Sequence, residues 1–204
     1  MKKVILIAIL FVGFVSFMNA QTPVTLTSFH SNFSQLEEVQ TILQMGVLDG
    51  KSAYFLMDEN NPIDQKAAII NALVDSDRDS DNATTFSMFV ARKYGANFQD
   101  MDLNLLSADE LFCLGYLTIM DEKGSPELAL PIFEIALQKD AKSYTIQLIN
   151  ALAEAQSSIN QKENCTAWNT FSAVATSTSY TNDLDANIKN ELNNAMSTYK
   201  EGCE

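Results

Sequence analysis

The segment from Ser107 to Ala141 constrains the fold most, because it has the pattern of two amphipathic helices joined by a turn. Ser107 and Glu110 have the spacing of a capping box, in which each side chain bonds the backbone N–H of the other residue. Gly124 is expected to end this helix, and Pro126 is typical of the first position of the next one. Neither helix can bury its apolar stripe alone. The segment therefore predicts a helical hairpin that packs against further helices.

This hairpin resembles the tetratricopeptide (TPR) repeat family. Leu114-Gly115 is followed by Ala129, Phe133 and Ala136, which matches the L-G and A-x3-F-x2-A elements of that repeat. The resemblance implies that the small residues lie where two helices cross closely and that the aromatic ring fills the gap between hairpins. It also implies a groove along successive first helices that holds a peptide or a partner chain.

The hairpin departs from the TPR pattern at several positions. Thr118 stands where the family has a tyrosine, and Ala141 stands where it has a proline. The turn is about two residues longer than in the family pattern. Pro131 falls inside the predicted second helix, where its missing N–H should kink the helix. We therefore expect a degenerate TPR-like hairpin.

An upstream segment has similar landmarks at a nearly constant interval. The acidic turn that begins at Met57 lies 63 residues before the one that begins at Met120, and Pro62 lies 64 residues before Pro126. Half of this interval, about 32 residues, is close to the length of a TPR repeat. The alternative interpretation is a chance similarity between two acidic turns.

The rest of the chain has helical periodicity, and strand patterns are scarce. Helices are predicted over residues 34–46, 47–57, 63–74, 83–94, 143–159, 164–174 and 183–199. We expect an all-α fold of about nine helices, in one domain over residues 34–204, after an extended lead-in at residues 21–33. Two arrangements fit this pattern: a TPR-like array of stacked antiparallel hairpins, or a compact orthogonal helical bundle.

Residues 1–20 have the pattern of a secretory signal peptide. Lys2 and Lys3 precede an apolar run, and Ala20 stands just before the predicted mature start at Gln21. The apolar run of about 14 residues is too short to span a bilayer comfortably. We therefore expect a secreted or periplasmic protein with no transmembrane segment after signal cleavage.

The chain is strongly acidic, with a formal net charge of −13. Removal of residues 1–20, which hold two lysines and no acidic residue, takes this charge to −15, from 11 basic against 26 acidic residues. A chain of this charge is repelled by phosphate backbones, so nucleic acid is excluded as a partner. A protein or peptide partner is expected to be neutral or basic.

An acidic stretch has part of the spacing of a calcium loop. Its candidate ligands are Asp75, Asp77, Asp79 and Asp81. Ser80 stands where such a loop has glycine, and Phe86 stands where it has a bidentate glutamate. Two interpretations remain: a weak calcium site, or an acidic linker in which Asp81 or Asn82 caps the next helix. No other cofactor is predicted.

Signals for catalysis are nearly absent. His30 is the single histidine and lies in the polar lead-in, where we expect a surface residue and not a metal ligand or a base. Adjacent acidic pairs could serve a glycoside hydrolase. They are Glu37/Glu38, Asp58/Glu59, Asp109/Glu110 and Asp121/Glu122. Each pair lies at a helix end or turn, which favours capping or solvation, so we do not expect an enzyme.

Three cysteines in an exported chain allow one disulfide and three pairings. Cys113 lies in an apolar helix and is expected to behave as a small buried hydrophobic residue. Cys165 begins one predicted helix, and Cys203 follows the next one. The two ends meet in an antiparallel hairpin if Gly202 turns the tail back, so a Cys165–Cys203 disulfide is predicted.

Two functional hypotheses remain ahead of the hydrolase. The first is an exported helical-repeat protein that mediates protein or peptide interactions in the periplasm or cell envelope. The second is a secreted helical protein that binds a small ligand or calcium in a pocket between helices.

Overall fold

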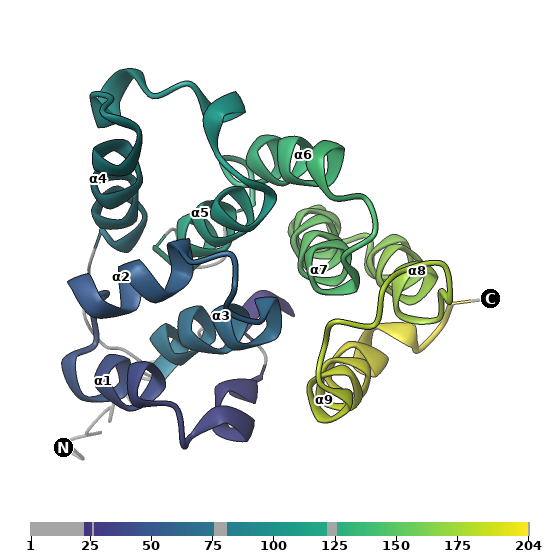
Figure 1. The fold of residues 1–204 in the computed structure, drawn as a ribbon. Coiled ribbons are helices and arrows are strands. Elements are labelled where there is room, and N and C mark those ends of the chain that lie inside the picture. The colour runs from purple at the N-terminus through teal and green to yellow at the C-terminus, as the bar shows by residue number, and fades with distance from the viewer. Residues whose placement is uncertain (1–22, 26, 76–80, 122–125, 204) are drawn as a thin grey trace, which may run out of the picture.

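Figure 1 shows the computed structural model, which describes residues 23–25, 27–75, 81–121 and 126–203. These residues form α-helices and short 3₁₀-helices, with no β-strand among them. The α-helices are α1 (Glu37–Met45), α2 (Gly50–Met57), α3 (Ile63–Asn71), α4 (Asn82–Tyr94), α5 (Ala108–Asp121), α6 (Leu130–Lys139), α7 (Tyr144–Asn160), α8 (Asn164–Ala175) and α9 (Ala186–Met196). The 3₁₀-helices are η1 (Pro23–Thr25), η2 (Phe29–Phe33), η3 (Ala72–Asp75), η4 (Phe98–Asp100), η5 (Leu103–Leu105) and η6 (Ser197–Lys200). The all-α prediction is confirmed.

Several helix ends follow directly from local sequence. The Ser107 hydroxyl accepts a bond from Glu110 N at 3.2 Å, and Glu110 Oε2 accepts one from Ser107 N at 2.9 Å, which completes the predicted capping box. Gly46 and Gly95 end α1 and α4 in the left-handed region, with φ of 70° and 65°. Asp81 caps α4 by accepting a bond from the Thr84 N–H.

Pro131 does not kink a helix, so that prediction is wrong. The second helix of the hairpin, α6, begins at Leu130, several residues later than expected, and Pro131 lies in its first turn. A missing N–H costs nothing there, because the first four donors of a helix have no partner within it. The predicted ends at Gly124 and in the turn that follows lie outside the described residues.

The α5–α6 hairpin packs as closely as its small residues suggest. A Cβ built on Gly115 would lie 3.0 Å from the ring of Phe133, which is fully buried. Only glycine allows this ring to lie against the α5 backbone. The glycine and the aromatic residue therefore belong to one contact within the hairpin.

The helices surround α5 and do not form TPR repeats in the described residues. In a repeat array each hairpin contacts only its neighbours along the chain. Here α5 packs against α2, α3, α4, α6 and α7, and α3 also contacts α7. Figure 1 shows α1 to α4 on one side of α5 and α7 to α9 on the other. The stacked array is not seen, and the contacts fit a compact helical bundle.

The lead-in is not extended, and the surface position predicted for His30 is wrong. Pro23–Thr25 form η1 and Phe29–Phe33 form η2, and Val24 and Phe29 are buried in the common core. His30 is only 4% exposed. The segment is buried because η1 packs on α7 and η2 packs on α3 and α9.

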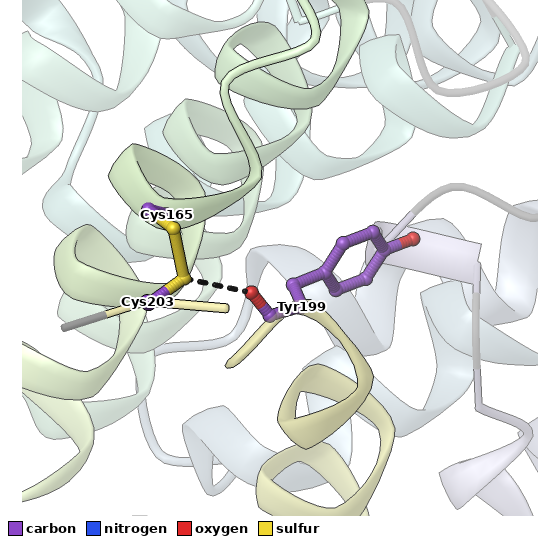
Figure 2. The surroundings of a disulfide bond; sticks show 3 residues. All are labelled: Cys165, Tyr199 and Cys203. Atoms are coloured by element: carbon purple, nitrogen blue, oxygen red, sulfur yellow. Dashed lines mark hydrogen bonds between the residues drawn. A yellow bond between two sulfur atoms is a disulfide. The ribbon is translucent and has the colours of Figure 1, made fainter. Parts of the chain in front are cut away.

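The predicted disulfide is present. Cys165 and Cys203 are bonded, with their Cα atoms 5.3 Å apart. Gly202 has a φ of 82°, the conformation that turns the tail back toward the start of α8. Figure 2 shows Cys203 beside the carbonyl of Tyr199, 3.3 Å from its sulfur. Cys113 is buried and free, as predicted.

No helix in the described part of the chain combines the length and apolar character that a bilayer span requires. The predicted signal peptide, residues 1–20, lies outside the described residues.

Candidate functional site: a groove between two helices

An open groove of about 570 Å³ lies between α2 and α4. These two helices contact each other on the α1–α4 side of the molecule (Figure 1). The groove is lined by Tyr54, Met57, Asp58, Phe89, Arg92 and Lys93. It thus combines apolar and aromatic side chains with charged groups of both signs.

The aromatic wall of the groove exists because α2 faces the core with only part of its surface. Ala53 and Leu56 are fully buried, whereas Tyr54 is 56% exposed. The Tyr54 ring meets the Phe89 ring edge to face, with centroids 5.4 Å apart. Gly50 makes room for this pair, since a Cβ there would lie 3.3 Å from the Phe89 ring. An exposed tyrosine ring and a partly buried phenylalanine ring therefore form one wall of the groove.

Lys93 is held in place by the buried carboxylate of Glu110. Its Nζ lies 2.8 Å from Glu110 Oε1, and the Tyr94 hydroxyl donates to Oε2 at 2.8 Å. Burial alone would raise the pKa of Glu110, but bonds from Lys93, Ser107 N and Tyr94 together lower it below its ordinary value. The same bond to Glu110 raises the pKa of Lys93. Both groups are ionised, and the charge of Lys93 is already compensated.

The other two charged groups of the groove lack an ion pair. Arg92 is exposed, and in the part of the chain that the structure describes its guanidinium makes no hydrogen bond or salt bridge. Asp58 accepts bonds from the N–H and the side-chain amide of Asn60, and these bonds lower its pKa. As far as the described residues go, the groove therefore offers one unpaired cation, Arg92, and one ionised carboxylate, Asp58, beside its aromatic wall.

The calcium candidates are not brought together in the described residues. Asp75 Oδ2 lies 3.3 Å from Nε2 of His30, and Asp81 caps α4. Asp77 and Asp79 lie outside the described residues. Over the described ranges, no group of three or more His, Cys, Asp or Glu side chains could hold a metal ion.

Most of the paired carboxylates make structural contacts, whereas Glu122 lies outside the described residues. Ion pairs join Lys66 to Asp109 and Lys51 to both Glu37 and Glu38. Asp121 accepts bonds from Asn82 Nδ2 at 2.8 Å and from Ala83 N at 2.6 Å, so it joins the end of α5 to the start of α4. Burial raises the pKa of Asp121 despite these bonds. Helix capping and ion pairing thus account for these side chains.

The groove was missed by the sequence analysis. The residues on its two walls are about 35 positions apart, and no periodicity links α2 to α4. One usable signal is Tyr54, an aromatic residue that lies off the buried stripe of a short apolar helix.

No family model, curated protein or solved structure matches this chain. The groove is therefore interpreted from its own chemistry.

Proposed function

We propose that this chain is an exported binding protein that holds a segment of a protein or peptide partner in the α2–α4 groove. The observation that carries the proposal is the Tyr54–Phe89 pair, with Tyr54 56% exposed in an open groove. Exposed tyrosines in a pocket are frequent hot spots, because a rigid ring supplies a large contact area at low entropic cost.

Two features support export. Residues 1–20 have the charge and apolar pattern of a signal peptide, and Cys165 is bonded to Cys203. Disulfides persist in oxidising compartments and are rare where thiols are kept reduced. The bond thus agrees with a periplasmic or extracellular location.

The open shape of the groove favours a polypeptide segment over a small ligand. Small-molecule sites commonly enclose about 300–1,000 Å³ and bury most of the ligand surface. The volume here falls in that range, but the groove is open to solvent between two helices. A chain segment can cross such a groove and continue on either side, as helices do in helix-in-groove complexes.

A peptide-display selection tests this proposal. Displayed peptides are selected on residues 21–204, and the affinity of the selected peptides is then measured for the Tyr54→Ala and Leu128→Ala variants. Leu128→Ala is the control, because it removes a 64% exposed apolar side chain two positions before α6, away from the groove. We expect Tyr54→Ala to weaken binding by roughly tenfold to thirtyfold and Leu128→Ala to have little effect. Equal affinity for the wild-type and Tyr54→Ala proteins would contradict the proposal.

A further inference from the structure

The groove places an aromatic wall and the guanidinium of Arg92, which has no partner among the described residues, one helical turn apart. Phe89 and Arg92 both belong to α4 and are three positions apart, so they are neighbours on one face of that helix. A guanidinium presents several N–H donors in a planar fork that matches a carboxylate. The spacing of these two residues therefore matches a ligand that has an apolar group and an anionic group about one helical turn apart.

Arg92 is the group in this groove that is available to an anion. Lys93 already bonds Glu110, whose other oxygen accepts from Tyr94. Asp58 is ionised and repels anions from its own end of the groove. Among the described residues, Arg92 is therefore the lining cation that no carboxylate pairs, on a chain whose net charge is −13.

The groove offers side chains and few free backbone groups. The N–H groups in the body of α2 and α4 bond within their helices, so no row of free donors is present to capture a chain terminus. Strand addition needs a sheet edge, and the described residues form no strand. The insertion of an amphipathic helix is a mode of peptide recognition that suits a groove between two helices.

From these observations we infer that the occupant is an amphipathic helix that carries an Asp or Glu three or four residues from an apolar anchor. This inference rests on the proposed function. The apolar anchor lies against Tyr54 and Phe89, and the side-chain carboxylate pairs with Arg92. The rest of the occupant is neutral or basic, because the chain as a whole is strongly acidic.

A focused peptide library tests this inference. The library consists of 16-residue helical peptides with a fixed Leu or Phe anchor, and the positions three and four residues after the anchor are varied among Glu, Gln and Lys. The proteins are wild type, Tyr54→Ala, Arg92→Glu and the control Lys142→Glu, which reverses an exposed charge on the α6–α7 connection. All four are checked for native helicity and melting temperature before selection.

We expect wild type and Lys142→Glu to prefer Glu over Lys by roughly threefold to tenfold, and Arg92→Glu to reverse the preference. Equal enrichment of Glu and Lys on wild type would overturn the inference while leaving the groove in place. Binding that is lost when the peptide C-terminus is amidated would assign the carboxylate to a chain end and would overturn the side-chain assignment. A library with no member that discriminates wild type from Tyr54→Ala would overturn the proposed function itself.

Discussion

Oδ1 of Asn71 accepts two hydrogen bonds from His30, one from the backbone N–H at 3.0 Å and one from the ring atom Nδ1 at 3.1 Å. The backbone group can only donate, which identifies Oδ1 as the acceptor and requires a proton on Nδ1 of His30. The amide nitrogen of Asn71 donates to Thr27 O and to the Tyr116 hydroxyl, at 3.1 Å and 3.3 Å. One buried asparagine in α3 thus connects the lead-in to α5.

We therefore predict that Asn71→Ala lowers the free energy of unfolding by about 2–4 kcal/mol, because it leaves buried donors and an acceptor without partners. Urea denaturation measures this loss. Asn104→Ala serves as the control, since the exposed side chain of Asn104 bonds Asp102, two positions away, and the bond that its carbonyl accepts from Lys139 remains in the variant. A loss equal to that of the control would show that the Asn71 bonds do not hold the lead-in.

The disulfide joins two cysteines that are 38 positions apart in the sequence. In the chain-entropy model, its loss through Cys165→Ser with Cys203→Ser lowers the free energy of unfolding by roughly 4 kcal/mol. Guanidinium denaturation of oxidised and mutant proteins measures the difference. A mutant as stable as the oxidised protein would contradict the prediction.

Cys113 should not react with alkylating reagents in the native protein. Burial raises the pKa of its thiol, so the reactive thiolate is scarce, and the side chain is inaccessible. Mass spectrometry after alkylation should find Cys113 modified only once the protein is unfolded. Labelling at the rate of a free thiol under native conditions would contradict the burial of Cys113.

Gly115→Ala should destabilise the α5–α6 hairpin. Alanine gains about 1 kcal/mol of helix propensity, but its Cβ would lie 3.0 Å from the buried Phe133 ring, and overpacking costs about 1–3 kcal/mol. We expect a net loss of about 1 kcal/mol, measured by thermal unfolding. Phe133→Leu makes room for the methyl group, so the double variant should lose less than the sum of the two single losses. Strict additivity would contradict the proposed clash.

Asp64 should make the protein less stable at neutral pH than at mildly acidic pH. Burial, followed by repulsion from Asp185 and Asp183, raises its pKa in the folded state. An acid with a raised folded pKa contributes stability below its unfolded pKa, and this contribution is lost as the pH rises through the folded value. Asp64→Asn should therefore stabilise the protein at pH 7, by less than about 1 kcal/mol because Asp64 is partly solvated, and this gain should vanish below about pH 3.

Glu110→Gln should change the pH dependence of stability in the opposite direction. The folded pKa of Glu110 is lowered, so its contribution is present above the unfolded pKa and is lost as the pH falls through the folded value. This variant should be less stable than wild type at pH 7 and should approach wild type in acid. Urea denaturation between pH 3 and pH 7 measures both variants. Parallel pH profiles for Asp64→Asn and Glu110→Gln would contradict both assignments.

Features that depend on neighbouring residues could be predicted from the sequence. The Ser107–Glu110 capping box and the left-handed ends at Gly46 and Gly95 need only contacts within one turn. The Cys165–Cys203 bond could also be predicted, since the expected export, an apolar helix around Cys113 and antiparallel helices favour this pairing. Helical periodicity determined the all-α class in the same way.

Features that depend on distant residues were decided only by the tertiary structure. A helical stripe shows that a helix packs, but not which helix it packs against, so the sequence left stacked hairpins and a compact bundle open, and the contacts around α5 fit the bundle. His30 is buried because Asn71, 41 positions away, meets its hydrogen bonds. The groove exists because packing brings Phe89 against Tyr54 and leaves both rings at the surface. Such contacts are set by how whole helices bury their apolar faces together, and short-range patterns in the sequence do not encode that choice.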